Sequence, residues 1–168
     1  MSLNRNEIGM LLSDVGVPNV VGMYLPTEDG KLDYIDIVAI THSKIYVVTV
    51  KGSTPLTSRL QLVESKPTNL LKRNYLHVLN LRVALAGEGS GWTILSKVLV
   101  SNEESVAGAH PSYCNSVELL DILSRDDLTK VHSEEAVAQM QSVLENMKAE
   151  NAILNALTIS TKCKKYAW

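Results

Sequence analysis

Phenylalanine is absent from this chain of 168 residues, and cysteine occurs only twice. Leucine, isoleucine, valine and tyrosine must therefore fill the core of a folded domain. The two cysteines, Cys114 and Cys163, are far apart in the sequence and show no Cys-x-x-Cys spacing. This pattern argues against a disulfide framework and against a zinc knuckle, and we expect reduced thiols in a cytoplasmic protein.

Long apolar runs and a strong charge of either sign are missing as well. No stretch of about 18 apolar residues occurs, and the first residues lack the charged-then-apolar pattern of a secretion signal. We therefore expect neither a membrane span nor secretion. The formal net charge is −2, so bulk electrostatics do not indicate a nucleic-acid-binding protein, although they are compatible with a local basic patch.

Sequence motifs of several common enzyme classes are also missing. The chain has no phosphate-binding Gly-x-x-x-x-Gly-Lys-Ser/Thr loop, no dinucleotide-binding fingerprint and no Gly-x-Ser-x-Gly nucleophile elbow. The length suits one hydrophobic core, and 45% of the residues are apolar. We expect a single domain over residues 1–168, with its core at about 5–148 and a C-terminal helix and basic tail at 149–168.

The chain does contain an alternation of helix-like and strand-like segments. The predicted helices span residues 4–14, 69–86, 116–123 and 133–157, and the predicted strands span 20–25, 33–40, 44–51, 56–63 and 93–100. We expect Ser116 and Ser133 to cap the last two helices. The apolar stripe predicted for the helix at 69–86 consists of Leu71, Tyr75, Val78, Leu79, Arg82 and Leu85. This order of elements predicts an α/β fold with a mixed β-sheet flanked by helices.

The most informative segment is residues 32–51, two β-rich runs separated by a short polar turn. If Ile40 pairs with Ile45 across that turn, Asp36 lies opposite Thr49, with Cβ atoms about 4.5–5.5 Å apart. Side chains alternate along a strand. The face predicted to carry the acid therefore consists of Tyr34, Asp36, Val38, Ile40, Ile45, Val47, Thr49 and Lys51. An aspartate, a threonine and a lysine are expected to converge at one end of the hairpin.

The order of an acid, a hairpin and then acid-x-Lys resembles the core of the restriction-endonuclease-like nucleases, whose motif is written PD…(D/E)xK. More narrowly, the segment resembles the nuclease-related domain (NERD), which carries an "IDhhhh…G-hhhhEhK" hairpin in which h is apolar. Residues 35–40 match its first half, and residues 45–51 match its second half with Thr49 in place of Glu. Residues 69–74 are similar to the family's "NPxxQN" helix opening but lack its Pro and Gln. The resemblance covers about residues 5–148 and implies a restriction-endonuclease-like mixed β-sheet flanked by helices.

This resemblance implies a site for Mg²⁺ or Mn²⁺. Nucleases of this class hold the metal with two or more carboxylates, the metal activates a water, and the lysine stabilises the transition state. The resemblance assigns Asp36 as a metal ligand, together with the carbonyl of Val50, and assigns Lys51 as the catalytic lysine. Thr49 is neutral at the degenerate position, so Asp36 and Lys51 either form a residual site or neutralise each other as an ion pair.

Two further acids are candidates to compensate for Thr49. Glu64 begins a second acid-x-Lys spacing, and Glu7 resembles an acid that NERD members carry on the first helix. Both are also compatible with simple surface charges. Asn69, Lys72 and Arg73 are candidate nucleic-acid-binding residues, because a helix N-terminus attracts phosphate; the alternative is an ordinary solvent-exposed face.

We therefore expect a degenerate NERD-like domain that processes nucleic acid or binds DNA, with weak or absent metal-dependent phosphodiesterase activity. The alternative is a non-catalytic protein-interaction module on a nuclease-like scaffold. The basic tail at 162–168 adds lysines and two aromatic residues, a mixture suited to single-stranded nucleic acid or to a frayed terminus.

Overall fold

The computed structural model describes residues 3–51, 67–87, 91–100 and 110–165. Its helices are α1 (Arg5–Asp14), α3 (Pro67–Ala84), α4 (Ser116–Leu128) and α5 (Glu134–Lys165). Its strands are β1 (Asn19–Pro26), β2 (Leu32–Ile40), β3 (Lys44–Val50), β4 (Thr93–Leu99) and β5 (Tyr113–Cys114). The strand expected at 56–63 lies outside the described residues.

The five strands form one mixed sheet in the order β1-β2-β3-β4-β5. The pairs β1–β2 and β2–β3 are antiparallel, and the pairs β3–β4 and β4–β5 are parallel. A parallel neighbour requires a crossover connection, and α3 lies on the chain between β3 and β4. The prediction of an α/β fold with a mixed sheet is confirmed.

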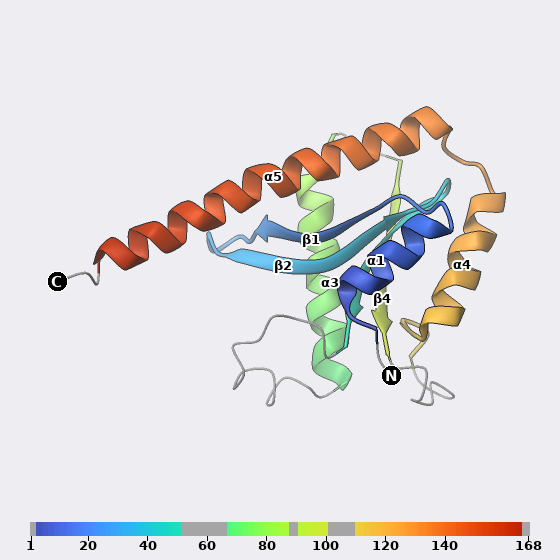
Figure 1. Cartoon of the computed structure of the whole chain (residues 1–168), viewed down its shortest axis with the longest axis horizontal. Coiled ribbons are helices and arrows are strands. Elements are labelled where there is room, and N and C mark those ends of the chain that lie inside the picture. The colour runs from blue at the N-terminus through green and yellow to red at the C-terminus, as the bar shows by residue number, and fades with distance from the viewer. Residues whose placement is uncertain (1–2, 52–66, 88–90, 101–109, 166–168) are drawn as a thin grey trace.

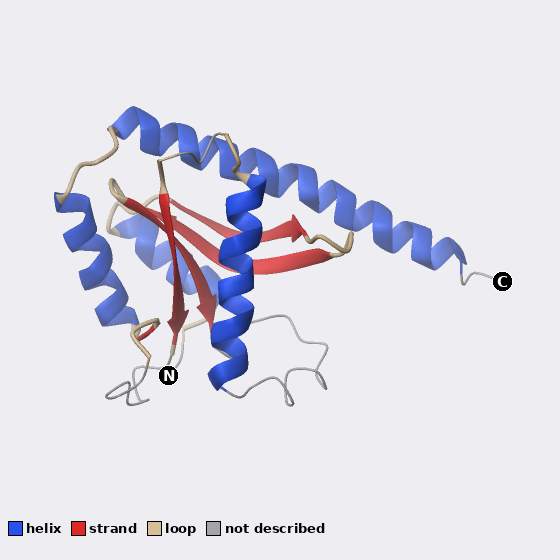
Figure 2. Cartoon of the chain, turned by 180° about the vertical axis from the view of Figure 1, so that it is seen from behind, coloured by secondary structure: helices blue, strands red, loops and turns tan. Residues whose placement is uncertain are grey.

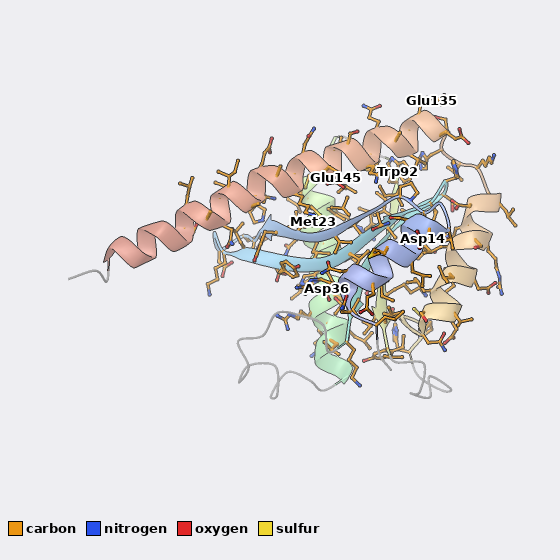
Figure 3. The ribbon with its side chains drawn as sticks, in the orientation of Figure 1. Asp14, Met23, Asp36, Trp92, Glu135 and Glu145 are labelled. Carbon is orange, nitrogen blue, oxygen red and sulfur yellow. The ribbon has the colours of Figure 1, made fainter. Side chains whose placement is uncertain are left out.

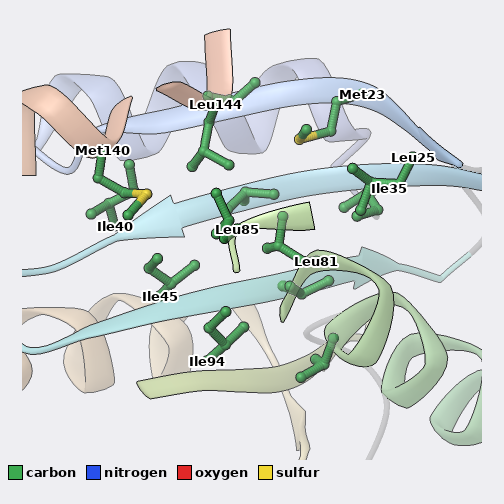
Figure 4. Packing of buried hydrophobic residues seen from close by; sticks show 14 of the residues in the cluster. Met23, Leu25, Ile35, Ile40, Ile45, Leu81, Leu85, Ile94, Met140 and Leu144 are labelled. Carbon is green, nitrogen blue, oxygen red and sulfur yellow. The ribbon is translucent and has the colours of Figure 1, made fainter. Parts of the chain in front are cut away.

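Helices cover both faces of this sheet (Figures 1 and 2). One face packs against α3 and α5 in a core that includes Val38, Val47, Leu81 and Leu144 (Figure 4). The other face packs against α1 and α4 through a second set of apolar residues. The second set consists of Ile8, Leu12, Val17, Ile37, Ala39, Tyr46, Val48, Val50, Leu99, Cys114, Leu119 and Leu123. The hairpin strands, which contribute to both cores, are therefore the centre of the molecule.

Local sequence signals explain where the helices α1, α4 and α5 begin. Asn4 caps α1, and Ser133 caps α5 by accepting a hydrogen bond from the Ala136 N–H at 3.1 Å. The cap expected at Ser116 is wrong, because Asn115 caps α4 through the Glu118 N–H. The two-residue strand β5 was not predicted, and α5 continues beyond the expected residue 157.

The buried face of α3 differs from the predicted apolar stripe. Tyr75 is 55% exposed and Arg82 is also exposed, whereas Asn74 and His77 are buried. The helix is therefore rotated so that two polar side chains face the sheet together with Val78.

Among the residues that the structure describes, no helix combines the length and apolar character that a membrane span needs.

Candidate functional site at the fork of the sheet

The β-sheet divides into two arms where β2 and β3 separate (Figures 1 and 2). The two strands pair over residues 37–40 and 45–48, with Ile40 opposite Ile45 as the sequence predicts. Beyond these residues β2 stays paired with β1 to its first residue, whereas β3 stays paired with β4 to its last. Polar side chains from α1, α3 and the strands gather at this fork.

Asp36 lies at the fork in the interior of the molecule, near α1 (Figure 3). The residue is 1% exposed. Its Oδ2 accepts a hydrogen bond from the Val50 N–H at 2.8 Å, and its Oδ1 lies 3.5 Å from Nη1 of Arg5. Burial raises the pKa of the Asp36 carboxyl above its ordinary value, against the opposing effects of the Val50 N–H and of Arg5.

The expectation that Tyr34 and Asp36 share a face with Val38 is wrong. Val38 belongs to the core beneath α3 and α5, whereas the ring of Tyr34 lies 4.9 Å from the guanidinium carbon of Arg5 on α1. Gly22 of β1, which lies beside this part of β2, has a φ of 69°. A positive φ is not a regular strand conformation, so the alternation of side chains breaks here. Asp36 consequently contacts α1 and the β3 backbone.

Thr49 faces α3 and is 2% exposed. Its hydroxyl donates a hydrogen bond to Oδ1 of Asn74 at 2.7 Å. The Asn74 amide nitrogen lies 2.9 Å from the Val47 carbonyl, 2.7 Å from the Ser96 hydroxyl and 3.0 Å from the Lys97 carbonyl. The position at which the resembling family carries a glutamate is thus occupied by a hydroxyl that belongs to a buried, neutral network between α3, β3 and β4.

A second acid of β2, Asp33, is in contact with a histidine of α3. Nε2 of His77 lies 2.9 Å from Oδ2 of Asp33, in a close contact without ideal hydrogen-bond geometry. The His77 side chain is 3% exposed, and its Nδ1 has no hydrogen-bond partner among the described residues. Burial favours the neutral form of Asp33. His77, the Tyr34 N–H and, more weakly, Arg73 together outweigh burial and hold the pKa of Asp33 below its ordinary value.

Lys51 lies at the end of β3, half-buried, where its N–H donates to the Leu99 carbonyl at 2.9 Å. Arg5 of α1 contacts Asp36, an interaction that the sequence predicted for Lys51. The helix α1 therefore supplies the charge that balances the buried acid.

The remaining expected residues are dispersed. Asn69 and Lys72 lie in the first two turns of α3, with Lys72 exposed, and Arg73 is half-buried beside Asp33. Glu7 is exposed, and its carboxylate contacts Asn4 at the start of α1 in a capping box. Glu64 lies outside the described residues.

The metal expected at this position does not fit the residues around Asp36. In the described ranges, no group of three or more histidine, cysteine, aspartate or glutamate side chains is arranged to hold a metal ion. Mg²⁺ requires about six oxygen ligands in near-octahedral geometry. At Asp36 one carboxylate oxygen already accepts a backbone N–H and the other lies beside a guanidinium.

Four residues of the fork were missed as site residues: Arg5, Asp33, Asn74 and His77. A signal for two of them exists on α3. Its buried residues Leu70, Asn74, His77, Val78, Leu81 and Leu85 recur at spacings of three and four. Asn74 and His77 are the polar members of this otherwise apolar set, and buried polar residues of a helix need partners inside the protein. No comparable signal marks Arg5.

A scan against models of known protein families found no match, and neither did a search of curated proteins or a search of solved structures. The fold and the polar cluster at the fork are therefore the observations that bear on function.

Proposed function

We propose that this chain is a degenerate NERD-like domain of the restriction-endonuclease class, which binds nucleic acid but does not cleave it through a metal at Asp36. The observation that carries the loss of cleavage is the state of the two positions that would hold the metal. Both oxygens of Asp36 are engaged, and the Thr49 hydroxyl is committed to Asn74. A divalent ion would have to displace Arg5 and a backbone hydrogen bond to reach a single carboxylate.

Basic side chains around the fork support the binding part of the proposal. Arg5 contacts Asp36, Arg73 lies near Asp33, and Lys51 directly follows Val50 at the end of β3. Lys72, which directly precedes Arg73 on α3, adds an exposed charge. Phosphate groups are bound by such clusters through charge and counterion release, which does not require a basic protein overall.

The experiment that tests this proposal combines a cleavage assay with a binding assay. The wild-type protein is incubated with plasmid and single-stranded DNA in the presence of Mg²⁺ or Mn²⁺, and binding is followed by fluorescence anisotropy over a salt series. We expect no cleavage and a binding constant that falls with salt. Lys72→Glu should weaken binding and reduce the salt slope by about one. The matched control is Lys130→Glu, an exposed lysine between α4 and α5.

Two outcomes would contradict the proposal. Cleavage that Asp36→Asn abolishes would show that a metal does bind at the fork. Absence of both cleavage and salt-dependent binding would favour the alternative, a protein-interaction module that keeps only the scaffold.

A further inference from the structure

One edge of the β-sheet is formed by β1, and α5 lies beside this strand (Figures 1 and 2). Among the described strands, β1 is the first in the sheet and pairs with β2 alone. A strand at an edge presents N–H and C=O groups that have no partner within the sheet, and these groups can pair with a strand of another chain. The outer edge of β1 is therefore a site for strand addition unless another element covers it.

Two side-chain amides of α5 bind the backbone of β1. Nδ2 of Asn151 donates to the Tyr24 carbonyl at 2.7 Å, and Nε2 of Gln141 donates to the Asn19 carbonyl at a longer 3.5 Å. Asn151 is 6% exposed, and a buried amide needs a partner inside the protein. The helix thus supplies two hydrogen-bond donors to carbonyls of the edge strand.

The spacing of the amides matches the spacing of the carbonyls. Gln141 and Asn151 are ten residues apart, which is about 15 Å along a helix. Asn19 and Tyr24 are five residues apart, which is about 17 Å along a strand. Carbonyls five residues apart point to opposite edges of a regular strand, but Gly22 lies between these two and its positive φ breaks the alternation. Both carbonyls consequently point to α5.

The sequence of β1 carries no charge that would deter a second strand. Residues 19–26 include no aspartate, glutamate, lysine or arginine. Charged side chains, especially lysine, are a common means by which edge strands avoid pairing with another copy. Pro26, which has no N–H, protects only the last position of the strand. Two copies of β1 can therefore pair without repulsion between like charges.

We propose that α5 covers the free edge of the sheet through Gln141 and Asn151, and that β1 of a second copy of the chain adds to this edge when α5 is released. The two β1 strands then pair antiparallel, because a two-fold arrangement uses the same edge of both copies and closes on itself. The wild type is monomeric because α5 occupies the position of the added strand. This proposal does not depend on nucleic-acid binding at the fork, since its test measures self-association alone.

Sedimentation equilibrium over a wide range of concentration tests the proposal. Wild type should remain monomeric. Asn151→Leu removes the donor but keeps a side chain of similar size, and it should form a reversible dimer. The double variant Gln141→Leu/Asn151→Leu should dimerise at an about tenfold lower concentration, because a second hydrogen bond of the cover is lost. The matched control is Asn146→Leu, an exposed asparagine of the same helix, which should remain monomeric.

A second control separates release of α5 from a general loss of stability. Leu123→Ala removes a fully buried side chain of α4 from the core on the other face of the sheet, so the contacts of α5 with β1 stay in place. It should lower the melting temperature without causing dimerisation. A folded Asn151→Leu protein that stays monomeric at every concentration overturns the proposal, as does equal dimerisation of Leu123→Ala. Gln141→Leu alone provides the same test at a half-buried position if Asn151→Leu does not fold.

Hydrogen exchange identifies the strand through which the variant associates. In Asn151→Leu, the amides of residues 19–25 should exchange more slowly at high protein concentration than at low concentration, because hydrogen bonds to the second copy protect them. The amides of β5, at the other end of the strand order, should show no such change. Slower exchange at β5 instead, or at neither strand, would mean that β1 is not the associating edge and would overturn the proposal.

Discussion

Two carboxylates on one strand, Asp33 and Asp36, have pKa values that their surroundings shift in opposite directions. Both are desolvated, but His77, the Tyr34 N–H and Arg73 together stabilise the ionised form of Asp33 strongly enough to reverse the effect of burial. At Asp36 the Val50 N–H and Arg5 oppose burial without overcoming it. The fork therefore holds one carboxylate that stabilises the fold when ionised and one whose ionisation carries a cost.

This difference predicts the pH dependence of Asp33→Asn. Because the folded-state pKa of Asp33 is lowered, its contribution to stability is present above the unfolded-state pKa and is lost as pH falls through the folded-state value. The stability difference between wild type and Asp33→Asn should be largest near neutral pH and should shrink below about pH 4. Urea unfolding across this range measures it, with exposed Asp14→Asn as control. A difference that grows on acidification would show the opposite shift.

Position 49 gives a second test at the scale of a residue. Thr49→Glu would place a carboxylate against Asn74 in a site that is 2% exposed, and the side chain would not face Asp36. We expect a loss of several kcal/mol of stability, since an unpaired buried charge is strongly unfavourable, and no recovery with Mn²⁺. Thr49→Val should cost about 1–3 kcal/mol, because it leaves only the Asn74 oxygen unsatisfied.

Thermal unfolding with and without Mn²⁺ distinguishes the possibilities at position 49. A melting temperature that Mn²⁺ raises in Thr49→Glu but not in wild type would mean that the glutamate restores a metal site with Asp36. An equal rise in both proteins would point to a metal site completed by another acid.

At the scale of elements, the docking of α1 on β1 depends on the absence of a side chain at Gly9. A Cβ atom at Gly9 would lie 2.3 Å from Cγ2 of Val21, which is closer than atoms can approach. Val21 is β-branched on a strand, so its methyl group cannot move easily. Gly9→Ala should therefore destabilise the protein by about 1–3 kcal/mol, although alanine is the better helix former.

Chemical denaturation of Gly9→Ala, Val21→Ala and the double variant measures this contact. The double variant should be more stable than the sum of the two single effects predicts, because the methyl group of Val21 that clashes is removed. Strict additivity would mean that Gly9 is not packed against Val21.

The longer described strands and the register of the β2–β3 hairpin were predictable from sequence, because β-rich runs and the short polar turn at 41–44 define them locally. The turn before β2 was predictable as well, and Gly30 has the expected positive φ, at 78°. The rotation of α3 was predictable only in part. Leu70, Val78, Leu81 and Leu85 mark the buried face by their spacing, but Asn74 and His77 look like surface residues until their partners on β2, β3 and β4 are known. The fork was missed for a similar reason. It depends on the conformation of Gly22, and a glycine in a strand pattern does not reveal its φ.

At the scale of the whole molecule, the two cores are separable from the part of α5 after Asn151, which projects beyond the sheet (Figure 1). The apolar residues of α5 in the core end with Leu144, and Met147 packs against that core from its edge. Beyond Asn151, residues 152–154 and 156–158 of α5 are exposed. Tertiary packing supplies most of a helix's stability in proteins, so the projecting segment should contribute little to the folding of the monomer.

Deletion of residues 152–168 tests this separation. We expect the truncated chain to unfold cooperatively with a melting temperature close to that of the full chain. Leu144→Ala is the contrasting variant, and it should cost about 2–5 kcal/mol because it removes a fully buried side chain from the core of α3 and α5. A truncated chain as unstable as Leu144→Ala would mean that the projecting segment supports the fold itself, and that its exposed apolar residues pack on their own chain in solution.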